Sequence, residues 1–302
     1  MALVSASAAA LGVLDPSKLQ LGSANVLVID AEGGETIYSK SADKVTSIAS
    51  LTKLMTAMVV LDAGQPMDEI LEVDIADFDF IKGSGSRLGL GSQLSRREML
   101  RLALMSSENR AASAVARYYP GGNAAFVAAM NGKARELGMT RSRFTDSTGL
   151  SPDNVSTAND LAKMVRAAAQ YGVIREFSTT PSTFVEVDVG GRVLGFNNSN
   201  RLVASQSWQI LLQKTGYIRE AGRCLVMLAT IASKPVVIVL LDSIGTYTRL
   251  GDAERVKHWL ETGNAMPVAK AKGANPSKAR KATTTRVRGT LPARTPAQVR
   301  RR

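Results

Sequence analysis

In this 302-residue chain, Ser50 and Lys53 are three residues apart, and their types and spacing suggest a catalytic nucleophile with its base. They lie in residues 47–63 (SIASLTKLMTAMVVLDA), where apolar residues at helical spacing predict a helix. Residues three apart share one face of a helix, so the hydroxyl and the amine can enter one pocket. A serine hydroxyl is a weak nucleophile that needs a base, and burial can lower the pKa of a lysine enough to make it one.

The composition argues against histidine, thiol or metal chemistry. The single histidine, His258, lies in an amphipathic stretch (DAERVKHWLE) that predicts a helix-surface residue. The single cysteine, Cys224, lies in an apolar run (CLVMLATIA), which predicts a buried thiol and excludes an internal disulfide. A catalytic zinc site normally takes several His or Cys ligands. The sequence implies no metal and no organic cofactor.

Two short motifs further along the chain could complete a site around Ser50. Residues 107–109 (SEN) follow an apolar helical stretch and offer a second hydroxyl and an amide. Residues 214–216 (KTG) end an apolar strand, and the glycine would let a substrate approach that strand closely. Each motif is weak alone. Residues 41–44 (SADK) also fit S-x-x-K, although no long apolar helix follows them, and residues 23–25 (SAN) also fit S-x-N; KTG occurs once.

In this order the three motifs form the signature of serine β-lactamases and penicillin-binding proteins, with Glu108 where that signature has Asp. The chain resembles the low-molecular-mass penicillin-binding proteins, the D-Ala-D-Ala carboxypeptidases and endopeptidases, over about residues 20–262. Three longer segments are also similar to the family consensus: 48–57 (IASLTKLMTA), 144–151 (FTDSTGLS) and 156–162 (STANDLA).

The resemblance implies an acyl-transfer mechanism with five catalytic residues. Ser50 attacks the carbonyl of a D-alanine, and Lys53 takes its proton. Ser107 passes a proton to the leaving amine, and Asn109 binds the peptide oxygen of the substrate. Lys214 supplies positive potential.

The resemblance also implies the substrate-binding residues. Thr215 offers a hydroxyl to the carboxylate beside the scissile bond, Gly216 gives close access, and the Tyr217 N–H joins the Ser50 N–H in binding the oxyanion. Arg249 precedes the last predicted helix, where the family often places an arginine that binds the carboxylate; the alternative is a solvated surface arginine. Arg223 is a weaker candidate of the same kind.

The SEN motif and residues 214–219 (KTGYIR) are more similar to the endopeptidase branch than to the carboxypeptidases. The latter usually carry S-G-N and a second, β-rich domain. We therefore expect a serine D,D-endopeptidase that hydrolyses D-alanyl-diaminopimelate crosslinks in peptidoglycan and is inhibited covalently by β-lactams. The alternatives are a D-Ala-D-Ala carboxypeptidase with the same site, a catalytically silent wall-binding protein on this scaffold, and a basic nucleic-acid-binding protein.

The order of sequence patterns predicts an α+β fold of three layers: a five-stranded antiparallel sheet flanked by helices, with an all-helical lobe at about 66–170, as in β-lactamases and DD-transpeptidases. The site is expected in the cleft between lobe and sheet. The predicted strands are 24–30, 35–39, 208–214, 223–232 and 235–242. A hairpin is predicted at 183–196, and helices at 47–63, 95–106, 110–118, 123–137, 157–171 and 252–262.

The two ends of the chain differ from its body. Residues 1–20 predict either a shortened signal peptide or a flexible N-terminus, and residues 21–265 the catalytic domain. The net charge of +12 comes almost entirely from the segment 266–302, which has four Lys, seven Arg and no acidic residue. That composition predicts a disordered basic tail. It could bind an anionic wall or membrane surface, or only solubilise an exported, periplasmic enzyme; no nucleic acid partner is expected.

Overall fold

The computed structural model describes residues 14–80, 82–188 and 190–267. Its main sheet has five antiparallel strands in the order β2-β1-β11-β10-β9. Their bounds are β1 (Ser23–Asp30), β2 (Thr36–Lys40), β9 (Gln209–Ile218), β10 (Gly222–Ile231) and β11 (Lys234–Ser243). The continuously apolar run in β11 is buried on both faces, as a central strand requires. The predicted five-stranded antiparallel sheet is confirmed.

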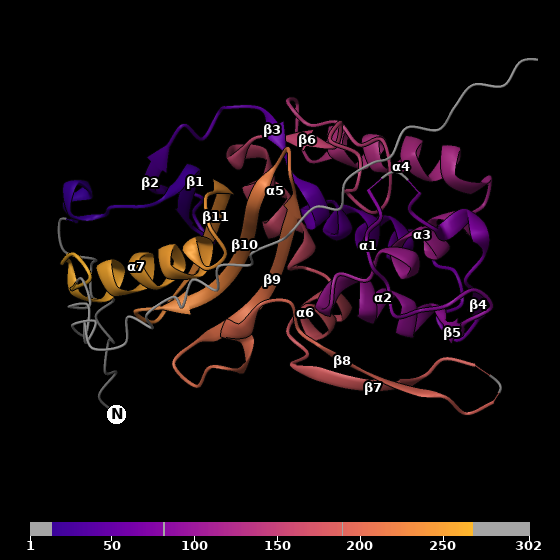
Figure 1. The fold of residues 1–302 in the computed structure, drawn as a ribbon. Coiled ribbons are helices and arrows are strands. Elements are labelled where there is room, and N and C mark those ends of the chain that lie inside the picture. Colours follow the sequence, from indigo (N-terminus) through magenta and orange to yellow (C-terminus); the bar gives the residue numbers. More distant parts are fainter. Residues whose placement is uncertain (1–13, 81, 189, 268–302) are drawn as a thin grey trace, which may run out of the picture. The chain divides into compact units, whose positions relative to one another are not determined.

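Helices cover both faces of this sheet (Figure 1). On one face lies α7 (Thr248–Thr262), whose apolar side, including Val256 and Trp259, packs against β1, β10 and β11. On the other lies α5 (Ala158–Ala168), which contacts the same three strands through buried Leu161 and Val165. The prediction had placed this segment in the helical lobe. It covers the sheet instead, because its apolar face meets the even-numbered side chains of β10.

The helical lobe is built around α1 (Thr52–Asp62), whose residues 52–60 are all buried. A helix that is apolar on every side belongs in the middle of a packed layer. It contacts α2 (Arg96–Met105), α3 (Asn109–Arg117) and α4 (Gly122–Glu136). The short helix α6 (Gly172–Ser178) was not predicted. It packs between α2 and β9.

Short elements adjust the sequence-based boundaries near Ser50. The predicted helix 47–63 is divided into β3 (Thr46–Ser47), the 3-10 helix η2 (Ala49–Leu51) and α1. Strand β3 pairs with β6 (Val155–Ser156). The remaining small sheets are β4 (Ile70–Glu72) with β5 (Gln93–Ser95), and the predicted hairpin, β7 (Ser182–Glu186) with β8 (Val193–Asn197). The other 3-10 helices are η1 (Pro16–Lys18), η3 (Ile75–Asp77) and η4 (Arg201–Ala204). Among the described residues, no helix has the length and apolarity needed to cross a membrane.

Candidate active site

Ser50 lies in η2, where the backbone is forced into an unusual conformation. The preceding residue, Ala49, has φ of 49°, a left-handed conformation that costs a non-glycine residue about 1–2 kcal/mol. Such strain persists only where the surroundings impose it. Strand β9 packs against this turn: a β-carbon on Gly216 would lie 3.0 Å from the Ile48 carbonyl oxygen and 3.1 Å from the Ser50 nitrogen. Gly216 thus allows β9 to run directly beside the Ser50 backbone.

The amine of Lys53 is fully buried one helical turn beyond Ser50. Its Nζ donates to Ser50 Oγ at 3.0 Å, to Asn109 Oδ1 at 2.7 Å and to the Thr148 carbonyl at 2.7 Å. Burial lowers the pKa of Lys53 to about 7, although the charges of Asp146 and Glu108 oppose the shift. A large neutral fraction is therefore present near pH 7, and a neutral amine can accept the Ser50 proton.

The SEN motif lies where α2 leads into α3, and its Asn109, the first residue of α3, contacts Lys53 directly. Asn109 accepts from Lys53 and donates through Nδ2 to Ser84 Oγ at 3.1 Å. Ser107 is half-buried with φ of 63°, and its hydroxyl has no hydrogen-bond partner among the described residues. Glu108 turns elsewhere: its carboxylate accepts from the Ser86 hydroxyl and from the Arg110 N–H. Glutamate at this position therefore anchors the loop at 84–86.

The KTG motif lies in β9, one of the two edge strands of the main sheet. Lys214 is fully buried, and its Nζ donates to the Thr215 carbonyl at 3.0 Å. Burial, with smaller contributions from the charges of Lys53 and Arg249, holds the pKa of Lys214 well below its ordinary value. The Thr215 hydroxyl donates to Ser199 Oγ at 2.7 Å. The described residues show no direct hydrogen bond between Lys214 and Ser107 or Ser50.

Arg249 belongs to the site's surroundings and not to a freely solvated surface. It lies in the first turn of α7, is half-buried, and donates through Nη1 to the Gly216 carbonyl at 2.8 Å. Burial, and then the charge of Arg223, lowers the pKa of Arg249. Tyr217, next along β9, is 57% exposed. The structure thus joins Ser50, Lys53 and Asn109 by hydrogen bonds, places Gly216 beside the Ser50 backbone and bonds Arg249 to Gly216. Lys214, Thr215 and Tyr217 lie with Gly216 in β9, and no hydrogen bond links Ser107 to these residues in the described part of the chain.

A loop to which no sequence motif gave a role completes the surroundings of Lys53. Asp146 accepts hydrogen bonds from the backbone N–H groups of Thr148 at 2.6 Å, Gly149 at 2.6 Å and Ser151 at 2.9 Å. These bonds fold residues 146–151 into a turn that aims the Thr148 carbonyl at Lys53. The family-like segment 144–151 was the available signal, but no titratable or nucleophilic pattern marked its role. Ser199 and Ser84 were missed for the same reason.

Two cavities differ in their position relative to the predicted site residues, and one of them adjoins the surroundings of Lys53. Asn109 and Thr148 line a cavity of about 440 Å³ whose walls include Phe78, Phe80 and Leu150. Space for substrate therefore adjoins the Lys53 environment.

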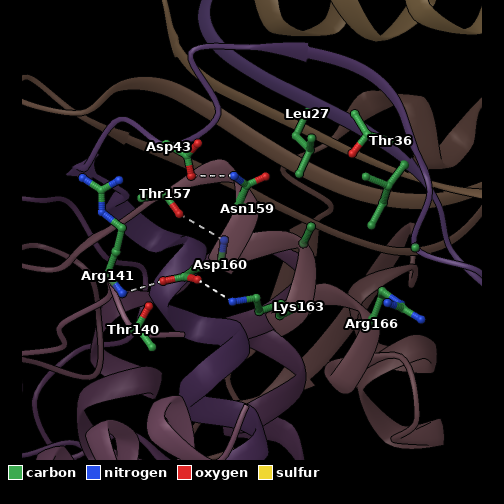
Figure 2. Close-up of a pocket in the computed structure, with 13 residues that line it drawn as sticks. Leu27, Thr36, Asp43, Thr140, Arg141, Thr157, Asn159, Asp160, Lys163 and Arg166 are labelled. Atoms are coloured by element: carbon green, nitrogen blue, oxygen red, sulfur yellow. Dashed lines mark hydrogen bonds and ion pairs between the residues drawn. The ribbon is translucent and has the colours of Figure 1, made fainter. Parts of the chain in front are cut away.

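A second cavity, of about 450 Å³, lies between β1, β2 and α5 and contains none of the predicted site residues (Figure 2). Asp160 and Lys163 form an ion pair among its lining side chains, and Arg166 donates to the Glu32 carbonyl. Asp160 accepts from Lys163 at 3.0 Å and from the Arg141 backbone N–H at 2.8 Å, and Asp43 accepts from Asn159 at 2.7 Å. Two of these bonds connect α5 to Arg141 and Asp43 outside it.

The geometry at Ser50 agrees with what known proteins indicate. Residues 13–245 match the family model described as D-alanyl-D-alanine carboxypeptidase, peptidase S11. The chain belongs to the peptidase S11 family. This S11 peptidase is 50% identical over 256 residues to the D-alanyl-D-alanine endopeptidase of Pseudomonas aeruginosa, covering 84% of this chain and 83% of that one. It is 49% identical over 255 residues to the D-alanyl-D-alanine endopeptidase of Escherichia coli K12, covering 84% and 82% respectively.

Solved structures place the S11 peptidase in the same fold. The Streptomyces K15 DD-transpeptidase superposes with a TM-score of 0.75 at 28% identity, covering 80% of this chain and 98% of that one. Penicillin-binding protein D2 of Listeria monocytogenes, in its ampicillin-bound form, gives a TM-score of 0.69 at 30% identity with the same coverage. The family resemblance and the DD-transpeptidase-like fold expected from the sequence are confirmed.

Proposed function

We propose that this S11 peptidase is a serine D,D-endopeptidase that hydrolyses D-alanyl-diaminopimelate crosslinks in peptidoglycan. The observation that carries the proposal is the buried Lys53 amine 3.0 Å from the Ser50 hydroxyl. Such a pair is a nucleophile with its base. The choice of substrate is supported by the two relatives named D-alanyl-D-alanine endopeptidase, each matched over more than four fifths of its length.

The reaction begins with proton transfer from Ser50 to neutral Lys53, as Ser50 Oγ attacks the carbonyl carbon of the D-alanine. A base positioned in this way is typically worth about 10²–10⁴ in rate. The backbone N–H groups of Ser50 and Tyr217 bind the oxyanion; removal of one such donor typically costs about 10²–10³ in rate. The C–N bond then breaks, Ser107 delivers a proton to the leaving amine, and water later hydrolyses the ester on Ser50.

Substrate binding is assigned to the groups around this reaction centre. Asn109 binds the substrate's peptide oxygen, while Thr215 and Arg249 bind the carboxylate beside the scissile nitrogen. Lys214 is assigned to supply positive potential, a role that requires its protonated form although burial and the charges of Lys53 and Arg249 lower its pKa. Gly216 supports the assignment of Tyr217, since its missing side chain brings β9 next to the Ser50 nitrogen.

β-Lactams are expected to acylate Ser50, because they mimic the acyl-D-Ala-D-Ala end of the substrate. The solved ampicillin-bound relative from Listeria monocytogenes supports this expectation. We expect a lasting adduct in place of rapid drug hydrolysis. A mass shift equal to benzylpenicillin, lost in Ser50→Ala, is the corresponding test; prompt release of hydrolysed drug without an adduct would contradict it.

The decisive experiment offers the purified full chain a crosslinked muropeptide dimer and, separately, a monomeric pentapeptide, with Ser50→Ala as control. Conversion of the dimer to monomers, absent in the variant, is the expected result. Loss of only the terminal D-alanine from the pentapeptide would replace the proposal with the carboxypeptidase activity, which the family model's description favours. Full turnover by Ser50→Ala would remove Ser50 from the mechanism.

The proposal also covers where the enzyme acts in the cell and what its basic tail does. We place the catalytic domain at residues 21–265 and the enzyme in the periplasm, where its substrate lies. Residues 1–13 and 268–302, which hold most of the predicted export signal and tail, lie outside the described residues. The eleven positive charges after residue 266 are proposed to hold the enzyme near anionic wall or membrane surfaces. Deletion of 267–302 should weaken binding to isolated sacculi most at low salt; unchanged binding at every salt concentration would contradict the tethering.

A further inference from the structure

Three arginines without a carboxylate partner lie near the end of β9 that follows the KTG motif. Arg219, Arg223 and Arg249 all lie there, and among the described residues none of them forms an ion pair with Asp or Glu. The nearby Glu220 is already bound to Lys82 at 2.5 Å. Unpaired cations beside a reaction centre create a potential that attracts anions.

Arg223 is held in a defined position within this group. It lies opposite Tyr217 in the β9–β10 register, and its guanidinium stacks on the Tyr217 ring at 4.5 Å from the centroid. Stacking occupies the face of a guanidinium and leaves its N–H edge available. No hydrogen bond of the Arg223 side chain is formed within the described residues. The donor edge is therefore oriented but uncommitted, next to the residue proposed to bind the oxyanion.

Arg249 lies close enough to Arg223 for the two positive charges to interact. Burial lowers the pKa of Arg249, and the like charge of Arg223 lowers it further. The Nε atom of Arg249 is buried and has no hydrogen-bond partner in the described structure. On the neighbouring strand, the Asp242 carboxylate lies against Gly222 and pairs with neither arginine. Two mutually repelling guanidiniums with free donors form a site suited to more than one anionic group.

We infer that Arg223, stacked on Tyr217, is a specificity-determining residue that binds a second carboxylate of the leaving group, beyond the one assigned to Thr215 and Arg249. The inference rests on the proposed function. A leaving D-alanine carries one carboxylate. The diaminopimelate of a second stem peptide carries one beside the scissile nitrogen, and its own stem supplies more. Arg223 therefore favours crosslinked substrates over terminal D-alanine.

The test uses two small substrates that differ by one charge. Both have the form acyl-D-Ala-X; X is D-2-aminoadipate in one and its side-chain amide in the other. Wild type should prefer the acid by about tenfold to a hundredfold in kcat/KM, the range of a charge-assisted hydrogen bond. Arg223→Gln should bring the acid-to-amide ratio to within about threefold of one, and Arg223→Lys should keep an intermediate ratio. A wild-type ratio near one, or a ratio unchanged in Arg223→Gln, would overturn the inference.

Arg219→Gln is the matched control, because it removes the same charge from the same hairpin where the cation is not stacked on Tyr217. Its ratio should stay within about threefold of wild type; an equal loss would assign the preference to diffuse potential and overturn the role of Arg223. Benzylpenicillin adduct formation shows that each variant is folded. The endopeptidase proposal is decided separately, by wild type on the crosslinked dimer. The inference would also be overturned if wild type cleaved neither small substrate while it still formed the benzylpenicillin adduct.

Discussion

Gly149 packs its α-carbon directly against the carbonyl oxygen of Ala49, the residue before Ser50. A β-carbon at Gly149 would overlap that oxygen and lie 2.9 Å from the Ser50 nitrogen. Gly149 also has φ of 80°, a conformation that favours glycine. The loop that supplies the Thr148 carbonyl and the turn that supplies the Ser50 hydroxyl are therefore in direct contact, so that the position of one determines the position of the other.

Gly149→Ala should displace Ser50 as well as destabilise the protein. The left-handed backbone alone costs alanine about 1–2 kcal/mol, and the overlap with Ala49 adds to this. We expect a fall of at least tenfold in the rate of benzylpenicillin acylation, measured by mass spectrometry, together with a lower thermal midpoint.

Gly138→Ala is the control for backbone strain alone. Gly138 has φ of 66°, and a β-carbon there would meet nothing within 4 Å. It should lower stability by about 1–2 kcal/mol with acylation unchanged. Equal acylation by Gly149→Ala and wild type would show that the contact with Ala49 does not position Ser50.

The acylation rate should rise with pH and level off above about 7. The buried Lys53 has its pKa lowered to about 7, and only its neutral form can take the Ser50 proton. Below that pKa the neutral fraction falls about tenfold per pH unit, so the rate falls with it. Stopped-flow acylation between pH 5 and 9 measures this limb. A rate independent of pH over that range would exclude Lys53 as the titrating base.

Glu108→Gln should shift the rising part of the pH–acylation profile to lower pH. The charge of Glu108 raises the pKa of Lys53, opposing the larger effect of burial. Glutamine keeps the length and can still accept from Ser86 and from the Arg110 N–H. The midpoint of the pH profile is the readout, since a merely structural effect would lower the rate without moving it. A midpoint that stays in place or rises would contradict this electrostatic account.

Asp146→Ala should disorganise the loop that faces Lys53. The carboxylate accepts hydrogen bonds from Thr148, Gly149 and Ser151, and bonds to charged groups contribute about 1.5–3 kcal/mol each. We expect a loss of at least about 2 kcal/mol in unfolding free energy and a tenfold or greater fall in acylation. Asp153→Ala is the control: its carboxylate is 67% exposed and its ion pair with Arg143 is loose at 3.6 Å. If both variants behave alike, the Asp146 network is not what positions Thr148.

Ser199→Ala should weaken substrate binding while leaving the fold intact. Ser199 Oγ accepts from the Thr215 hydroxyl, which orients that group. Loss of one neutral hydrogen bond predicts a three- to tenfold fall in kcat/KM, about 1 kcal/mol, with the thermal midpoint nearly unchanged. Ser207→Ala, at an exposed position nearby, should have no effect. A fall in stability as large as the fall in activity would assign Ser199 a structural role only.

The local patterns in the sequence predicted most of the secondary structure, because periodicity reports which face of an element is buried. Ser50 and Lys53 could be paired from their spacing once the SEN and KTG motifs were taken with them, since residues 41–44 have the same spacing. The role of Glu108 could not be predicted, since its partner Ser86 comes from a loop that no sequence pattern connects with the SEN motif. The packing of α5 on the sheet was also missed. A helical pattern shows that one face is buried but not what covers it.

The sequence by itself identified the family, a candidate nucleophile with a candidate base, and the order of the five main strands, because each depends on residue type and short-range spacing. Only the tertiary structure decided what surrounds Lys53. Its partners Asn109 and Thr148 are 56 and 95 residues away in the chain. The lowered pKa follows from the exclusion of water by that packing. The pairing of Tyr217 with Arg223 likewise follows from strand register, which sequence spacing alone does not fix.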